Sequence, residues 1–167
     1  MTIRLAALAF AALGLTAAAP PPDPLKQLCD RLCGGTWQSS EIPVPDQFVT
    51  TYRYEWDARL GLVHGVQITV GGVGGIHTES DVFFGRDPSS GTLWMMTVRS
   101  DGPALYGTFE LGSDGYQTTV QALGGEAGKM ISTFAFTGPD EYAVTSEFLS
   151  KDEATRSLPQ TWRRQKD

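Results

Sequence analysis

Asparagine is absent from this 167-residue sequence, and cysteine and histidine occur only twice each. Without asparagine the chain has no acceptor for Asn-linked glycosylation. Basic residues are also few and scattered, with 13 lysines and arginines against 19 aspartates and glutamates. A nucleic-acid-binding protein needs a basic face that displaces counterions from phosphates, and anionic membrane surfaces likewise attract basic segments. The composition therefore argues against nucleic acids and anionic membrane surfaces as partners.

Long apolar runs are missing except near the start of the chain. Arg4 precedes an apolar run over residues 5–15, and alanines at 17–19 supply the small residues of a cleavage site. This arrangement predicts a secretory signal peptide over residues 1–19. The run is too short to span a bilayer comfortably, so we expect no integral membrane segment after cleavage. The mature protein is expected to be exported, periplasmic or extracellular, with 12 basic and 19 acidic residues and a net charge of −7.

Sequence patterns of nucleophilic and metal-assisted catalysis are also missing. The chain contains neither Gly-x-Ser-x-Gly nor His-Glu-x-x-His. The glycine-rich segment 71–75 is followed by isoleucine and histidine rather than by the Lys-Ser/Thr of a phosphate-binding loop, so we interpret it as a hairpin tip. We assign no catalytic residue and no cofactor from these patterns.

A short helix is predicted over about residues 24–33, behind the stiff proline-rich leader 20–24. Asp23 is a suitable N-cap, and Pro24 stands at the first helical position, where its missing N–H costs nothing. One apolar face has the spacing i, i+3, i+4 and i+7. Its members are Leu25, Leu28, Cys29 and Leu32. Because so short a helix is marginal alone, we expect it to pack against the rest of the chain.

From Gly35 onward, turn signals recur roughly every eight to twelve residues, between runs rich in β-branched and aromatic residues. Short connections favour an up-and-down meander, and about ten strands close into a barrel because closure removes the sheet edges. The sequence therefore predicts one all-β domain over residues 20–167, an antiparallel barrel over about 35–164 with the helix as a plug. The predicted strands span about 36–42, 47–57, 60–70, 76–86, 92–99, 104–111, 116–123, 129–137, 141–149 and 158–164.

The short helix, the segment Gly35-Thr36-Trp37 at the start of the first strand and the meander together resemble the calycin group. This group comprises lipocalins, fatty-acid-binding proteins and their bacterial lipocalin-like and nitrobindin-like relatives. Residues 84–94 and the closing Thr161-Trp162-Arg163-Arg164 are similar to exported bacterial lipocalin-like domains of unknown function. The resemblance implies a barrel that holds a small ligand, and its nitrobindin-like members imply haem bound by a histidine.

Strand alternation divides the side chains between the two faces of the sheet. In the second strand the aromatic set is predicted to face inward: Phe48, Thr50, Tyr52, Tyr54 and Trp56. In the third strand the predicted inward set is Leu60, Leu62, His64, Val66, Ile68 and Val70. Further inward residues are predicted in the fourth strand and near the C-terminus: Ile76, Thr78, Ser80, Val82, Phe84, Phe134, Phe136, Tyr142, Val144, Ser146 and Phe148.

These faces predict a pocket for a small apolar or amphipathic molecule inside the barrel. Its predicted lining is Tyr52, Tyr54, His64, Trp94 and Met96. Arg99, near the end of its strand, is expected to pair with an anionic head group, as arginines do in fatty-acid-binding relatives. Two alternatives are a haem-binding or enzymatic barrel that uses His64, and a filled barrel that serves as a structural or interaction domain.

Two other residue sets could carry chemistry. His77, Glu79 and Asp81 share one face and could hold a divalent metal, but the opposite face is the better inner one, so we predict no metal site. Cys29 and Cys33, at i and i+4 on a helix, would have Cα atoms about 6 Å apart, near the upper end of disulfide geometry. An exported compartment favours a disulfide between them over two free thiols.

Overall fold

The computed structural model describes residues 22–39, 48–71, 78–124, 128–150 and 154–165. The predicted signal peptide over 1–19, most of the glycine-rich segment 71–75, and His77 lie outside these residues. The described elements are α1 (Pro24–Leu32), β1 (Thr36–Ser39), β2 (Phe48–Asp57), β3 (Leu62–Gly71), β4 (Thr78–Arg86), β5 (Leu93–Arg99), β6 (Leu105–Leu111), β7 (Gly115–Ala122), β8 (Lys129–Gly138), β9 (Glu141–Leu149), β10 (Ala154–Arg156) and β11 (Gln160–Gln165).

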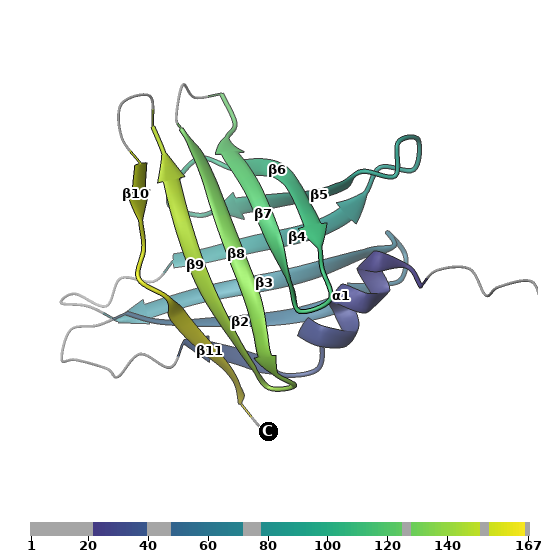
Figure 1. Ribbon diagram of the computed structural model, residues 1–167, viewed down its shortest axis with the longest axis horizontal. Helices are drawn as coiled ribbons and strands as arrows, with labels where there is room; N and C mark the ends of the chain where they lie inside the picture. Colours follow the sequence, from purple (N-terminus) through teal and green to yellow (C-terminus); the bar gives the residue numbers. More distant parts are fainter. Residues whose placement is uncertain (1–21, 40–47, 72–77, 125–127, 151–153, 166–167) are drawn as a thin grey trace, which may run out of the picture.

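The strands form a closed antiparallel barrel (Figure 1). Each strand from β1 to β8 pairs with the next strand along the chain. Strand β9 pairs with β11, and β11 pairs with β1, which closes the ring. This ten-stranded ring with one short helix confirms the predicted fold class. The short strand β10 was not predicted. It pairs with β9 at Glu147–Leu149, on the same edge along which β11 pairs farther down.

Helix α1 lies across one end of the barrel (Figure 1). As predicted, Asp23 caps its start, because the Asp23 carboxylate accepts a hydrogen bond of 2.9 Å from the backbone N–H of Leu25. Leu25, Leu28 and Leu32 are buried against the barrel core. Within the described residues no helix is long and apolar enough to cross a membrane.

Trp37 and Arg164 fix the helix to this end of the barrel. The Trp37 indole is fully buried, and its Nε1 donates a hydrogen bond of 2.8 Å to the carbonyl of Leu32. The Arg164 guanidinium lies 4.6 Å from the centre of the indole ring and donates to the carbonyls of Arg31, at 2.6 Å, and Cys33, at 2.9 Å. These carbonyls lie at the helix end, where they have no partner inside the helix. The first and last strands of the barrel, β1 and β11, therefore hold the helix in place.

The predicted disulfide is wrong: Cys29 and Cys33 are both free. The prediction assumed that both residues lie on the helix, but α1 ends at Leu32, and Cys33 has extended backbone angles of φ −74° and ψ 159°. Burial, followed by the hydrogen bond with Cys29, raises the pKa of the Cys33 thiol well above its ordinary value. Cys33 therefore remains a protonated thiol near neutral pH.

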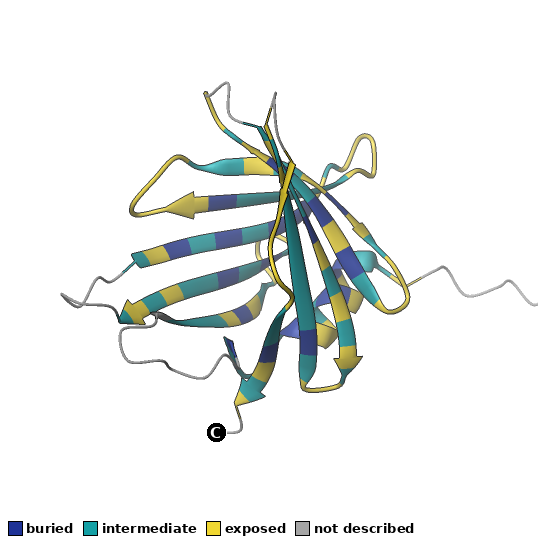
Figure 2. Cartoon of the chain, turned by 60° about the vertical axis from the view of Figure 1, so that its left-hand side comes forward, coloured by how far each residue is buried: buried dark blue, intermediate teal, exposed yellow. Residues whose placement is uncertain are grey.

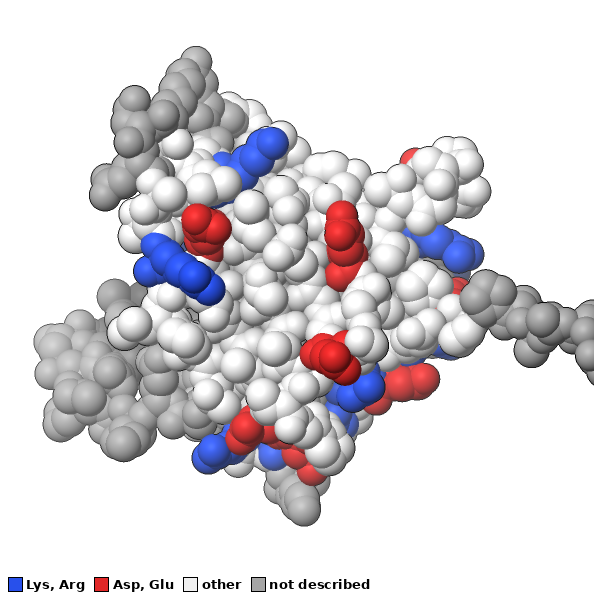
Figure 3. Space-filling view, viewed as in Figure 1, with Lys and Arg blue, Asp and Glu red and all other residues white. Residues whose placement is uncertain are grey.

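Alternating burial along the strands separates the two faces of the barrel (Figure 2). On β2, β4, β8 and β9 the described residues that line the interior lie on the predicted faces, among them Tyr54, Phe84, Phe134 and Tyr142. Phe148 is 46% exposed, and Ile76 and the side chain of Phe48 lie outside the described part of the structure. In β3 the prediction is wrong, because Val63 is fully buried while Ile68 and Val70 are 37% and 47% exposed. On the outer face shown in Figure 3, acidic and basic side chains are interspersed.

Cross-strand pairing explains the reversed face of β3. Tyr54 lies opposite Gly65, and Tyr52 lies opposite Gln67. Directly opposed residues point to the same side of a sheet, so the inward tyrosines of β2 place Gly65 and Gln67 inside the barrel. A Cβ atom at Gly65 would collide with the Tyr54 ring. Glycine there lets the large ring lie flat against the neighbouring strand.

Candidate ligand-binding cavity

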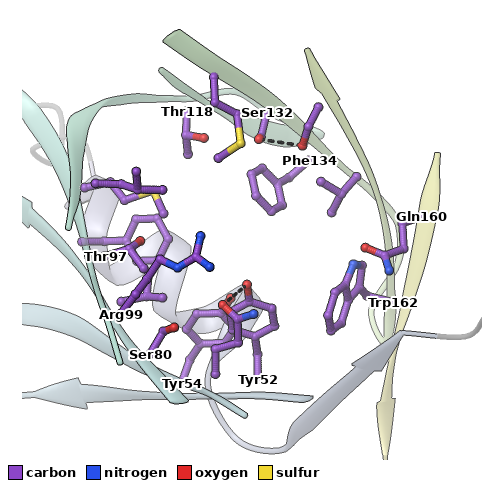
Figure 4. Close-up of a pocket in the computed structure, with 18 of the residues that line it drawn as sticks. Tyr52, Tyr54, Ser80, Thr97, Arg99, Thr118, Ser132, Phe134, Gln160 and Trp162 are labelled. Atoms are coloured by element: carbon purple, nitrogen blue, oxygen red, sulfur yellow. Dashed lines mark hydrogen bonds between the residues drawn. The ribbon is translucent and has the colours of Figure 1, made fainter. Parts of the chain in front are cut away.

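The half of the barrel that lies away from α1 contains a cavity of about 360 Å³. This volume is within the range of about 300–1,000 Å³ that is usual for small-molecule sites. Eleven of the 23 lining residues are polar or charged, and the other twelve are tyrosines or apolar residues. Figure 4 shows the cavity enclosed by side chains from strands on all sides. The barrel is therefore hollow at this end rather than filled.

The base of the cavity is aromatic. Two stacked pairs dominate it: Tyr52 and Tyr54 have ring centres 5.6 Å apart, and Tyr116 and Phe134 have centres 4.1 Å apart. We call the following lining residues the aromatic base: Tyr52, Tyr54, Phe84, Tyr116, Phe134, Tyr142 and Trp162. Burial raises the pKa of all four of its tyrosines above the ordinary value. The phenols are therefore neutral hydrogen-bonding groups and cannot act as bases near neutral pH.

Arg99 stands on the wall of the cavity near its mouth. Its guanidinium makes a two-point hydrogen bond with the carboxylate of Asp101, Nε at 3.0 Å and Nη2 at 3.1 Å. These hydrogen bonds are the largest cause that lowers the pKa of Asp101. The two side chains are 41% and 43% exposed, and both line the cavity. In Figure 4 the guanidinium points into the cavity, where it can face an anionic group on a ligand.

Cross-strand register arranges seven of the lining residues in two rows. One row crosses β2 to β5 and consists of Tyr52, Gln67, Ser80 and Arg99. The other crosses β7 to β9 and consists of Thr118, Ser132 and Ser146. Within the rows, Tyr52 donates to Gln67 at 2.8 Å and the hydroxyls of Ser132 and Ser146 are 2.8 Å apart. We call these the β2–β5 row and the β7–β9 row.

Of the six pocket residues predicted from sequence, the structure brings Tyr52, Tyr54 and Arg99 together in the cavity lining. Trp94 and Met96 lie on the outer face instead. Residues 94, 96 and 99 cannot share one face of a strand, because alternation separates even from odd positions. Phe84 lies inside the barrel and opposite Met95, so Met95 lines the cavity and its neighbours point outward.

His64 also lies on the outer face of the barrel. Its Nε2 is 2.8 Å from a carboxylate oxygen of Asp81, its Nδ1 is 3.6 Å from Glu55, and its ring stacks on Phe83 with centres 4.9 Å apart. A haem or substrate inside the barrel would therefore not reach His64. Among the described residues no three histidine, cysteine or acidic side chains are grouped closely enough to hold a metal ion.

Several lining hydroxyls were missed in the sequence analysis, above all Thr97, Thr118 and Ser132. Their spacing from large inward residues could have indicated that they face inward. Thr118 lies two residues from both Tyr116 and Val120, and Ser132 lies two residues before Phe134. The tyrosine Tyr116 was also missed. Its hydroxyl is buried and has no hydrogen-bond partner among the described residues.

Comparisons of the chain with models of known protein families, with curated proteins and with solved structures found no match. The barrel itself, ten antiparallel strands with one helix across an end, is compatible with a calycin-like fold. Its cavity makes it a β-barrel that could bind a small ligand.

Proposed function

We propose that this protein is an exported binding protein that holds a small amphipathic molecule in the cavity of its barrel. The observation that carries the proposal is the hollow half of the barrel, about 360 Å³, with an aromatic base and one guanidinium near the mouth. Export is supported by the predicted signal peptide over residues 1–19.

The two ends of the cavity suit the two ends of such a ligand. Aromatic side chains supply a large apolar contact area at little entropic cost, so the aromatic base would take the apolar part. The Arg99 guanidinium would form charge-assisted hydrogen bonds with an anionic group at the mouth. The Arg99 guanidinium is already hydrogen-bonded to the Asp101 carboxylate, so an anionic ligand would compete with this carboxylate.

The proposal is tested by titration with 1-anilinonaphthalene-8-sulfonate, an aromatic anion whose fluorescence rises in apolar surroundings. We expect saturable binding of one molecule per chain. Val144→Trp places an indole in the cavity and is expected to weaken binding more than tenfold, because Val144 is a lining residue. Thr145→Trp, on the opposite face of the same strand, is the matched control and should leave the affinity unchanged.

Arg99→Gln separates the head-group contact from the apolar contact. We expect about a tenfold loss of affinity for the anionic fluorophore, equivalent to about 1.4 kcal/mol. Arg53→Gln removes the same charge from an exposed position on the outer side of β2 and is the control. Circular dichroism establishes that every variant is folded. The absence of saturable binding, or equal binding by Val144→Trp and the wild type, would refute the proposal.

A further inference from the structure

Three of the hydroxyl groups that line the cavity have no hydrogen-bond partner among the described residues. Ser80, Thr97 and Thr118 are only 4%, 7% and 1% exposed, and all three line the cavity. No hydrogen bond joins any of their hydroxyls to another described residue, whereas Ser132, 4% exposed, is paired with Ser146. Among the described residues, the enclosed side-chain atoms without a partner are Tyr116 Oη and Arg164 Nε, so these three hydroxyls instead face the open space of the cavity. A ligand that displaces water from them must replace its hydrogen bonds, because an unpaired buried polar group is costly. These three hydroxyls are therefore positioned to bond to something inside the cavity.

The hydroxyls stand on two walls. Ser80 belongs to the β2–β5 row, directly opposite Arg99, and Thr97 lies two residues before Arg99 on β5. Thr118 belongs to the β7–β9 row, directly opposite Ser132. Figure 4 shows Ser80 and Thr97 beside Arg99, with Thr118 and Ser132 on the neighbouring wall. A ligand in the cavity would thus meet hydrogen-bonding groups on more than one side.

A plain alkyl chain does not fit this lining. Methylene groups packed against Ser80, Thr97 and Thr118 would leave three hydroxyls unpaired after water had been displaced. Serine and threonine hydroxyls both donate and accept, so they match ligand hydroxyls in either role. The cavity volume of about 360 Å³ has room for a compact ring.

We infer that the ligand is a hydroxylated ring carboxylic acid. The ring would lie on the aromatic base, the carboxylate would bind Arg99, and the ring hydroxyls would pair with Ser80, Thr97 and Thr118. This inference rests on the proposed function, because it specifies the class of molecule that the same cavity takes. It replaces the broader expectation of an apolar or amphipathic ligand with one whose polar groups are spread around a ring.

Two pairs of acids with matched skeletons test the inference by displacement of the bound fluorophore. Caffeate differs from cinnamate, and quinate from cyclohexanecarboxylate, in ring hydroxyl groups. We expect the hydroxylated member of at least one pair to bind at least tenfold more tightly. A preference of this size corresponds to one or two additional hydrogen bonds in a site that is built to receive them.

The double variant Thr118→Val with Ser132→Ala removes hydroxyls from one wall and nearly preserves the shape of the cavity. It is expected to reduce the preference to less than threefold. Thr119→Val, on the outer side of the same strand, is the control that should retain the full preference.

Each outcome separates this inference from the proposed function. Saturable fluorophore binding without a hydroxyl preference in either pair overturns the inference and leaves the proposed function standing. A preference that persists undiminished in the double variant also overturns it, because the hydroxyls of Thr118 and Ser132 are then not its cause. If the fluorophore itself does not bind saturably, the proposed function fails and the inference fails with it.

Discussion

The half of the barrel that α1 covers and the half that opens at the cavity mouth bury different kinds of side chain. Around α1 the fully buried residues are large and apolar, such as Leu28, Leu32 and Trp37. Around the cavity several of the most deeply buried side chains are hydroxyls, such as Ser80 and Thr118. We call these regions the closed half and the open half. The difference indicates that the closed half stabilises the fold while the open half is arranged for a ligand.

Single strands show the same division along their length. On β9 the inner face changes from Tyr142 through Val144 to Ser146 toward the mouth, and on β4 it changes from Phe84 to Ser80. Each strand therefore contributes apolar packing at one end and polar lining at the other. We expect substitutions in the closed half to lower stability and substitutions in the open half to change binding.

The largest effect is expected for Trp37→Ala. Removing this fully buried indole deletes its packing and its hydrogen bond to Leu32, so the free energy of unfolding should fall by about 3–5 kcal/mol. Trp94→Ala, on the outer face, is the matched control and should cost less than half as much. Chemical denaturation measures both. Equal losses for the two variants would contradict the assignment of the closed half as the stabilising region.

Arg164→Ala should have the next largest effect. Arg164 is largely buried, with 17% of its side chain exposed, and it satisfies carbonyls at the end of α1. Its loss is expected to cost about 2–3 kcal/mol because those carbonyls lose charged donors. The adjacent Arg163 is 61% exposed and forms an ion pair with Glu141 at the surface, so Arg163→Ala should cost less than about 1 kcal/mol. A comparable loss for both would show that Arg164 does not lock the helix.

Alkaline pH should weaken the protein through its buried tyrosines. Burial raises the pKa of Tyr54 and Tyr116, so the native state favours the neutral phenols. The stabilisation is complete below the ordinary tyrosine pKa of about 10 and is lost as the pH rises above it, because only the unfolded chain ionises readily. Absorbance at 295 nm should therefore show these phenols ionising together with unfolding. Ionisation of all tyrosines before any loss of structure would contradict their burial.

A smaller effect on binding is expected for Asp101→Asn. This change weakens the internal partner of Arg99 and should raise the affinity for the anionic fluorophore about three- to tenfold. Stability should change by less than about 0.5 kcal/mol, because both side chains are substantially exposed. Asp114→Asn, at an exposed turn, is the control. Reduced affinity in Asp101→Asn would mean that the aspartate contacts the ligand itself.

Much of the fold follows from local sequence, and the errors have a common cause. The faces of β2 and β4 were predictable because only one side of each has a regular aromatic or apolar pattern, as at Tyr52–Tyr54 and Val82–Phe84. Strands β3 and β5 carry apolar residues on both sides. Their orientation is decided by pairing with distant residues, Tyr54 with Gly65 and Phe84 with Met95, which no local pattern contains.

The same limitation applies to the site. Tyr52, Tyr54 and Arg99 could be predicted because an aromatic row and a lone arginine stand out in a strand. Ser80 was predicted to face inward, but neither its hydroxyl nor that of Thr118 was predicted as part of the pocket, because alternation gives the face of a residue and not its neighbours across the barrel. Only closure of the barrel brings these two residues into one cavity. The disulfide prediction was wrong because the helix ends one residue before Cys33.

The most direct test of the division between the halves is a map of amide chemical-shift changes in the NMR spectrum when 1-anilinonaphthalene-8-sulfonate is added. We expect the largest changes at Ser80, Thr97, Arg99 and Thr118, around the cavity, and none above the experimental noise in α1. Changes concentrated in α1, or at Trp94 on the outer face, would contradict the assignment of the open half as the ligand site.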